Sequence, residues 1–244
     1  MPNALLKDNK SETMLTTRQE KIKHNKLENV RETLNKINEN LNHVLCVTRF
    51  NDETYREYQN FANIQACSKN MNTLENVQEN VQENIYNVYN TPLPIAESKD
   101  FTNKYFIVME MLNTNNTIRG ISIIKNRPYY KKFKVYSDQN YNRHSYRIIT
   151  RINRTDLLYL EPTLINNLEK LVFTQKNHLK RGQGIQMIQT NYYKKLQTIS
   201  PIWESQDSAT IERTILESLW SLIEKHKNTI WDEQMIEVCK NMNT

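Results

Sequence analysis

The sequence predicts a predominantly α-helical protein with a small antiparallel β element near residues 104–154. Two observations lead to this fold class. Over most of the chain outside that region, apolar residues recur at intervals of three and four, which places them on one face of a helix. Within the region, β-branched and aromatic residues form short runs separated by turn residues, which is typical of strands. The same patterns divide the chain into four segments, 1–48, 49–103, 104–154 and 155–244.

Residues 1–48 are predicted to form a helical arm. Its clearest stretch is KLENVRETLNKINENLNHVL, residues 26–45. Six apolar residues follow steps of 3, 4, 3, 4 and 3 there: Leu27, Val30, Leu34, Ile37, Leu41 and Val44. These steps match a coiled-coil seam, but they cover fewer than three heptads, so an ordinary bundle helix is the favoured explanation. Where the seam pairs with another chain, neighbouring copies would exchange this arm.

Residues 49–103 are predicted to form an acidic helical segment. A first helix over 51–71 is built around Tyr55, Tyr58, Phe61 and Ile64. A second, over 72–90, contains the tetrapeptide VQEN twice in succession. Pro92 and Pro94 then end the helix, because proline lacks the backbone N–H and restricts the residue before it. We expect a domain boundary near 92–103.

The 72–90 helix has an unusually narrow apolar stripe. The stripe consists of Leu74, Val77, Val81, Ile85 and Val88. Nearly all residues between them are Asn, Gln or Glu, so the helix gains little by packing on its own domain. We therefore define a candidate acidic and apolar seam that another surface would cover. Its residues are Glu75, Val77, Glu79, Val81, Glu83 and Ile85.

Residues 104–154 form a basic, tyrosine-rich segment. The stretches TIRGISII, KKFKVY and SYRIITRI, at 117–124, 131–136 and 145–152, are predicted to be strands. Between residues 119 and 154 ten Lys and Arg side chains accompany one acidic residue, Asp138. The candidate basic patch consists of Arg127, Lys131, Lys132, Lys134, Arg143, Arg147 and Arg151. Tyrosines are interleaved with it at 129, 130, 136, 141 and 146.

Residues 155–244 are predicted to hold the helical core, within 160–242. One helix begins at Pro162, which suits a first helical position, and Gly182 ends it. A shorter helix over 185–196 is ended by Pro201. The widest apolar face belongs to ATIERTILESLWSLIEKH at 209–226. Thr229 and Asp232 resemble a capping box that would start a last helix.

Several classes of enzyme are excluded because glycine is scarce. The chain has only three glycines, Gly120, Gly182 and Gly184. No dinucleotide-binding GxGxxG, no P-loop and no GxSxG nucleophile motif can be written with them. His43 and Cys46 are spaced to share a metal, but nothing nearby completes a set of four ligands. We therefore expect no enzyme activity, no cofactor and no metal site. No apolar run reaches the ~18 residues of a membrane span, so no membrane insertion is expected.

The charge distribution supports two functions. A basic surface with aromatic rings suits single-stranded nucleic acid, because cations hold phosphates and rings stack on bases. Alternatively, the basic patch binds protein. Residues 51–100 carry eight acidic and three basic side chains, so the acidic seam of a second copy is a suitable partner. A contact between unlike patches can propagate without closing.

The chain resembles viral occlusion-body matrix proteins, in particular the polyhedrins of insect nudiviruses. The resemblance lies in its 29.2 kDa size, its opposite patches and its lack of a catalytic motif. It lies also in a composition of 33 Asn against 5 Ala and 3 Gly, which indicates AT-rich coding. It implies a structural protein that forms a crystal with copies of itself around virions. Such a protein would act in the infected host cell, in the nucleus, and leave it as extracellular occlusion bodies.

Two properties follow if this resemblance holds. Occlusion-body matrices often carry disulfides between copies, for which Cys46, Cys67 and Cys239 are the candidates, since three cysteines cannot all pair within one chain. Alkali would dissolve the lattice, because Tyr (pKa ~10) gains charge as Lys (pKa ~10.4) loses it. We expect a threshold above about pH 10.

Overall fold

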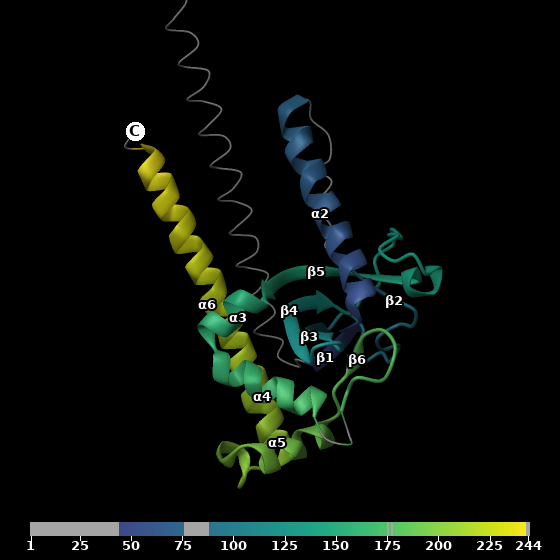
Figure 1. The fold of residues 1–244 in the computed structure, drawn as a ribbon, viewed down its shortest axis with the longest axis vertical. Helices are drawn as coiled ribbons and strands as arrows, with labels where there is room; N and C mark the ends of the chain where they lie inside the picture. Colours follow the sequence, from purple (N-terminus) through teal and green to yellow (C-terminus); the bar gives the residue numbers. More distant parts are fainter. Residues whose placement is uncertain (1–43, 76–87, 175, 177, 243–244) are drawn as a thin grey trace, which may run out of the picture. The chain divides into compact units, whose positions relative to one another are not determined.

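The computed structural model describes residues 44–75, 88–174, 176 and 178–242 (Figure 1). For residues 66–75 and 227–242 it describes the backbone alone. All of these residues belong to one unit of the chain, residues 43–244. The heptad-spaced helix predicted over 26–45 therefore lies outside the described residues except at its end. There, Val44 and Leu45 belong to a strand.

A curled six-stranded mixed sheet, shaped like half a barrel, forms the centre of the fold. Its order is β2-β5-β4-β3-β1-β6. The strands are β1 (Val44–Phe50), β2 (Val88–Thr91), β3 (Tyr105–Leu112), β4 (Thr117–Lys125), β5 (His144–Asn153) and β6 (Gln186–Met187). β1 and β3 run parallel, and the other neighbouring pairs are antiparallel. The prediction of a predominantly helical protein is therefore wrong, and the fold is of the α/β type.

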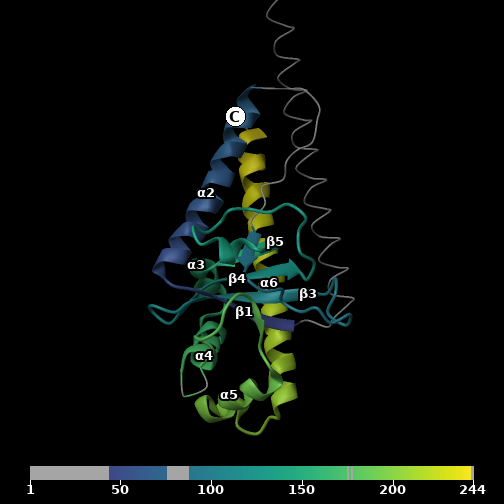
Figure 2. The same ribbon diagram turned by 90° about the vertical axis from the view of Figure 1, so that its right-hand side faces the viewer.

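Burial on both faces explains why the sheet was underestimated. In β3, YFIVMEML, every residue after Tyr105 is buried. β1 is similar, with five of its seven residues buried. Strands covered on both sides lose the alternation of apolar and polar residues that marks a half-exposed strand. Helices lie on both sides: α4 on one, with α5 beyond it, and α2 on the other (Figure 2).

The strand predictions within 104–154 have mixed outcomes. Those over 117–124 and 145–152 are confirmed as β4 and β5. The prediction over 131–136 is wrong, because this stretch is a loop. Its alternation is real, since Phe133 and Val135 are buried between exposed lysines. However, its backbone pairs with a side chain instead of a strand: Asn142 Oδ1 accepts from the N–H of Val135 at 3.0 Å.

The helices are α2 (Asp52–Glu75), α3 (Arg154–Leu160), α4 (Pro162–Phe173), α5 (Lys194–Ile199) and α6 (Ser208–Met242). Short 3₁₀ turns are η1 (Gln139–Asn142), η2 (Thr190–Tyr193) and η3 (Pro201–Trp203). α2 confirms the helix predicted over 51–71. It begins where Asn51 and Thr54 cap each other, with the Thr54 N–H donating to Asn51 Oδ1 at 2.8 Å and the Asn51 N–H to Thr54 Oγ1 at 3.0 Å.

The C-terminal helices are partly as predicted. Pro162 does occupy the first turn of α4, but that helix ends at Phe173, before Gly182. The helix predicted over 185–196 is replaced by β6, η2 and α5. α6 is continuous through residues 229–232, so Thr229 and Asp232 do not start a helix. The second helix predicted over 72–90 is wrong at its end, because Val88 opens β2, and residues 76–87 lie outside the described residues.

The hydrophobic core extends over both faces of the sheet. On the α2 side it includes Phe50, Tyr58, Phe106 and Tyr146. On the other side, α4 and α6 bury residues such as Leu168, Leu171, Ile211, Ile215 and Leu219, each at most 1% exposed. The expectation that the core lies within 160–242 is wrong, because most of the buried apolar residues precede residue 154.

Candidate functional site

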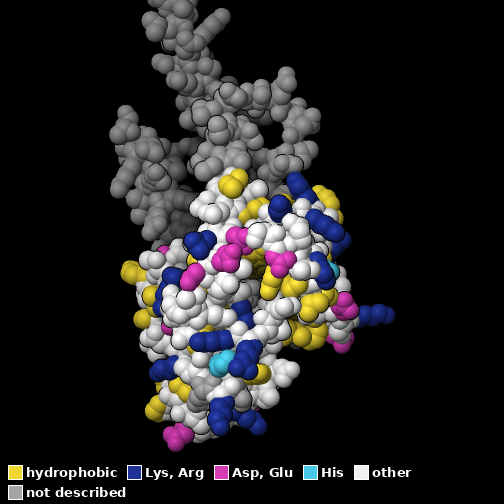
Figure 3. All heavy atoms as spheres, turned by 45° about the vertical axis from the view of Figure 1, so that its right-hand side comes forward, with side chains coloured by type: hydrophobic (Ala, Val, Ile, Leu, Met, Phe, Trp, Pro, Cys, Tyr) yellow, Lys and Arg dark blue, Asp and Glu magenta, His cyan; other side chains and the backbone are white. Residues whose placement is uncertain are grey.

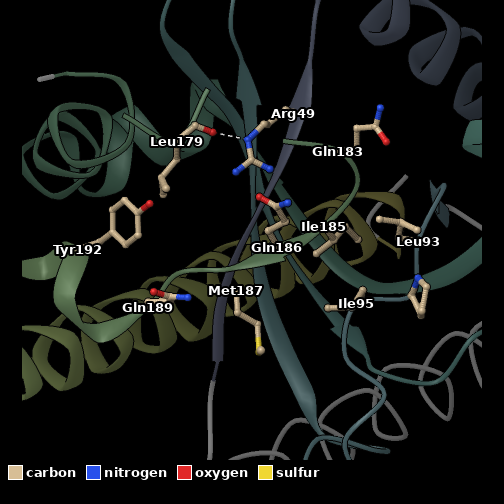
Figure 4. Close-up of a pocket in the computed structure, with 11 residues that line it drawn as sticks. Arg49, Leu93, Ile95, Leu179, Gln183, Ile185, Gln186, Met187, Gln189 and Tyr192 are labelled. Atoms are coloured by element: carbon tan, nitrogen blue, oxygen red, sulfur yellow. Dashed lines mark hydrogen bonds between the residues drawn. The ribbon is translucent and has the colours of Figure 1, made fainter. Parts of the chain in front are cut away.

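A half-open cleft with a volume of about 440 Å³ lies beside β1 and β6 (Figure 4). It is lined by Arg49, Leu93, Pro94, Ile95, Leu179, Gln183, Ile185, Gln186, Met187, Gln189 and Tyr192. Three stretches far apart in sequence therefore meet here: the end of β1, the residues after β2, and the loop and strand over 179–192. The volume of this cleft lies within the range of small-ligand sites.

Arg49 provides the only charge in the lining. Its Nε donates a hydrogen bond to the carbonyl of Leu179, whereas its Nη1 is buried and has no hydrogen-bond partner among the described residues. Nor does any carboxylate in the described part of the chain pair with it. Burial lowers the pKa of Arg49 to about 10, with Tyr192 acting in the opposite direction, so the side chain stays charged at neutral pH. A cation held in this way favours a ligand that brings hydrogen-bond acceptors.

Two glycines shape the turn that leads into β6. Gly182 and Gly184 have φ angles of +126° and +67°, which side-chain-bearing residues rarely adopt. A Cβ on Gly184 would approach the Thr91 Cβ to 3.2 Å, so this turn lies directly against the end of β2. The turn places Gln183 and Gln186 in the lining. Two of the three glycines in the whole chain are thus used to build this turn.

The rest of the lining combines amides with apolar surface. In Figure 4 the Arg49 guanidinium points toward the Gln186 amide, with Leu93 and Ile95 to one side and Tyr192 to the other. Gln183, Gln186 and Gln189 each offer hydrogen-bond donors and an acceptor. Leu93 is 56% exposed, which is unusual for a large apolar side chain. The lining therefore combines one cation, three amides, a phenol and six apolar side chains.

The surroundings of the cleft are basic. Residues 170–203 contain six Lys and Arg residues and no Asp or Glu. Lys176 and Arg181 of this tract are exposed, next to the residues that line the cleft. On the other side, Ile95 donates its N–H to the Tyr146 hydroxyl at 3.1 Å. Ala96 accepts from Asn126 Nδ2 at 3.1 Å, and Asn126 begins the basic loop over 126–143. The segment after β2 that lines the cleft is therefore followed by a residue, Ala96, that contacts the start of the basic loop.

The predicted basic patch is largely exposed. Arg127, Lys131, Lys132, Lys134, Arg143 and Arg147 are all exposed. Arg151 is not part of this surface, because it forms an ion pair with the buried Glu110. On the face shown in Figure 3, basic side chains are distributed over several places, with acidic side chains between some of them.

The tyrosines of this segment divide into two groups. Tyr136 and Tyr146 are buried, at 6% and 1% exposure. Burial raises the pKa of both phenols. These two tyrosines are therefore poor triggers for the expected dissolution in alkali. Tyr130, in contrast, is 86% exposed and lies against Tyr129, with 4.6 Å between ring centroids.

The other candidate residues are only partly described. Glu75 ends α2, where the backbone alone is described, and Val77, Glu79, Val81, Glu83 and Ile85 lie outside the described residues. Cys46 is a free, fully buried cysteine, and burial raises the pKa of its thiol. Cys67 and Cys239 lie in α2 and α6, in the stretches described by backbone only. The disulfide and lattice contacts stay predictions.

Sequence reasoning missed the cleft itself. Arg49, the three glutamines and Tyr192 were not singled out, because they are far apart in sequence and of common residue types. One usable signal was present: the stretch KRGQG at 180–184 carries two scarce glycines within an acid-free tract. Among the described residues, no group of three His, Cys, Asp or Glu is placed to hold a metal. No helix in that part of the chain is long and apolar enough to cross a membrane.

Comparisons with protein-family models, with curated proteins and with solved structures find no match for this chain. Its function is therefore argued from the cleft and its surroundings alone.

Proposed function

We propose that this protein binds single-stranded nucleic acid, with one base entering the cleft beside Arg49. The observation that carries the proposal is the buried Arg49 Nη1, which has no partner among the described residues, at a cleft lined partly by the acid-free basic tract over 170–203. A nucleotide can supply partners both to the cleft and to the basic residues outside it. Its base brings acceptors and flat apolar faces to the cleft, and its phosphates bring negative charge to the loops.

The exposed lysines and arginines provide the phosphate contacts. Lys132 and Lys134 are exposed residues of the 126–143 loop, and Lys176 and Arg181 are exposed residues close in sequence to the lining residues Leu179 and Gln183. Phosphate contacts of this kind hold a strand without reading its sequence. The exposed ring of Tyr130 adds a surface on which a neighbouring base can stack.

A single strand suits the cleft better than a duplex. In a duplex the base is paired and stacked, and moving it into a protein pocket costs a few kcal/mol. In a single strand the base is already accessible. The cleft has a volume of about 440 Å³, which suits one nucleotide and not a double helix.

The test is fluorescence anisotropy with labelled single-stranded and duplex oligonucleotides over a range of salt concentrations. We expect single strands to bind more tightly, with affinity that falls steeply as salt rises. Changing Lys132→Glu together with Lys134→Glu should weaken binding to all sequences and reduce the salt slope by about 1–1.5, since each phosphate contact contributes about 0.7. Arg213→Glu is the matched control, because Arg213 is an exposed residue of α6.

Binding that is absent, or equal in the Lys132/Lys134 variant and the control, would overturn the proposal. Self-assembly into an occlusion-body matrix is a separate proposal, based on the sequence. Sedimentation of the same protein at neutral pH tests it: large assemblies support it, and a monomer that binds oligonucleotides contradicts it.

A further inference from the structure

We infer that the cleft selects guanine, with the unpaired edge of the Arg49 guanidinium donating to O6 and N7 of the base. This inference depends on the proposed binding of single-stranded nucleic acid and adds to it a base identity. Its starting point is the hydrogen bonding of Arg49. Because Nε is occupied by the Leu179 carbonyl, the two terminal nitrogens are left to meet a ligand.

The chemistry of arginine narrows the choice of base. A guanidinium only donates, and two of its N–H groups lie side by side in a rigid plane. The best partner presents two neighbouring acceptors. Guanine does so with O6 and N7 and cytosine with N3 and O2, whereas adenine offers N7 beside an amino donor at N6. Of the first two, guanine has the second ring, which covers more of the apolar lining. Adenine would therefore set a donor against a donor and leave the buried Nη1 without a partner.

The glutamines complement the rest of a guanine. Guanine also carries donors, its N1–H and N2 amino group, which need acceptors. The side-chain carbonyls of Gln183, Gln186 and Gln189 can provide them, and Gln186 lies next to Arg49 in Figure 4. The apolar side chains of Leu93, Ile95 and Met187 can cover the faces of a two-ring base.

A phosphate is a poorer occupant of the same space. Arg49 is the only cation in the lining, and six of the eleven lining residues are Leu, Ile, Met or Pro. Phosphate has no apolar surface to cover these walls, and the single cation offsets only part of its charge. The exposed lysines outside the cleft suit phosphate better.

The experiment measures binding of the wild-type protein to oligothymidylates that carry one central test base. The test bases are guanine, inosine, 7-deazaguanine, adenine and cytosine. Guanine and inosine share O6 and N7, so both should bind about 10-fold or more tightly than adenine. 7-Deazaguanine lacks the N7 acceptor and should lose most of this preference. Equal binding of guanine and 7-deazaguanine, or tighter binding of cytosine, would overturn the inference.

Two variants test whether Arg49 causes the preference for guanine. Arg49→Lys keeps the charge but loses the planar pair of donors, so it should bind all test bases equally while keeping its salt dependence. Gln186→Met tests the cleft without changing Arg49, and should reduce the guanine preference. Thermal unfolding of each variant checks that it folds. A wild-type protein that binds every oligonucleotide equally contradicts guanine selection but keeps the proposed function, whereas a protein that binds none contradicts both.

Discussion

Glu110 and Arg151 form a two-point ion pair across the position of Gly120. Arg151 Nε lies 2.7 Å from Glu110 Oε1, and Arg151 Nη2 lies 2.6 Å from Glu110 Oε2. Glu110 is on β3 and Arg151 on β5, while β4 runs between them with Gly120 paired to Glu110. The pair can form because Gly120 has no side chain to separate the two groups.

Two buried tyrosines complete this cluster. The Tyr89 hydroxyl donates to Glu110 Oε1 at 2.6 Å and also lies 2.8 Å from Ser122 Oγ. The Tyr58 hydroxyl donates to the same Glu110 oxygen at 3.3 Å. Tyr58 belongs to α2, so the cluster ties this helix to the sheet. The carboxylate is fully buried yet satisfied on both oxygens.

Glu110→Gln should destabilise the fold by about 3–5 kcal/mol, because it leaves the Arg151 cation inside the protein without its charge partner. Arg151→Met should cost a similar amount, since it leaves a buried carboxylate. The double variant should cost less than the sum of the two. Urea unfolding measures all three. Glu161→Gln is the control, because Glu161 pairs with Lys225 at an exposed site, where such a pair contributes at most about 1 kcal/mol. Equal losses of stability for Glu110→Gln and Glu161→Gln would contradict a strong contribution from the Glu110–Arg151 pair.

Gly120→Ala should be destabilising in the wild-type background. The added Cβ would lie 2.6 Å from Glu110 Oε2 and 2.8 Å from Arg151 Nη2, so the ion pair must open. In a Glu110→Ala, Arg151→Ala background the space is empty. There the same change should stabilise by about 0.5–1 kcal/mol, because alanine loses less conformational freedom than glycine in a strand. Unfolding free energies measured in the two backgrounds show whether Gly120→Ala stabilises or destabilises the protein. The same direction in both backgrounds would contradict this account.

Stability should fall steeply in alkali. Burial, and then the charge of Glu110, raises the pKa of Tyr58 and Tyr89 well above the usual value. The folded state therefore holds these protons when the unfolded state has begun to release them. The contribution of these two tyrosines to the free energy of unfolding is complete below the unfolded tyrosine pKa of about 10. It is lost as pH rises beyond that value, by about 1.4 kcal/mol per pH unit for each tyrosine. Unfolding free energies measured between pH 8 and 11 test this.

A Tyr89→Phe variant separates this effect from the other titrating groups. It should be less stable at neutral pH, because the Glu110 oxygen loses a donor. Its stability should also decline less steeply above pH 10, since one phenol fewer titrates. A decline as steep as that of the wild type would show that Tyr89 is not responsible.

Gly184→Ala should impair the cleft more than the fold. The residue has a φ of +67°, where a side chain costs about 1–2 kcal/mol, and a Cβ would press on Thr91 and Pro92. The wall that carries Gln183 and Gln186 must then shift. We expect a fall in the midpoint of thermal unfolding of several degrees and a clear loss of oligonucleotide affinity. Retained affinity with the same thermal shift would mean that the wall does not shape the site.

Local signals predicted β4 and β5, α2, and Pro162 at the start of α4. β5 is only partly buried and α2 is capped by its own residues, whereas β4 is buried on both faces and was identified by its β-branched residues between turns. β1 and β3 could not be identified in this way, because a strand covered on both faces reads like a buried helix. The Arg49 cleft depends on the meeting of residues 49, 93–95 and 179–192, which is a property of topology and not of any local pattern. The ion pair of Arg151 could not be predicted for the same reason, because its partner Glu110 is 41 residues away in sequence.

The pairing of β1 with β6 has a consequence for synthesis of the protein. Cys46 and Met187 are partners in this pairing, so the outer edge of β1 has no strand to pair with until residue 187 has left the ribosome. At about 5–20 residues per second, the roughly 140 residues between them take on the order of 10–30 s to make. During that time an apolar strand with unpaired backbone groups is open to other chains. Nascent chains halted before residue 187 should therefore need chaperones, and release from them should coincide with translation of the KRGQGIQM stretch.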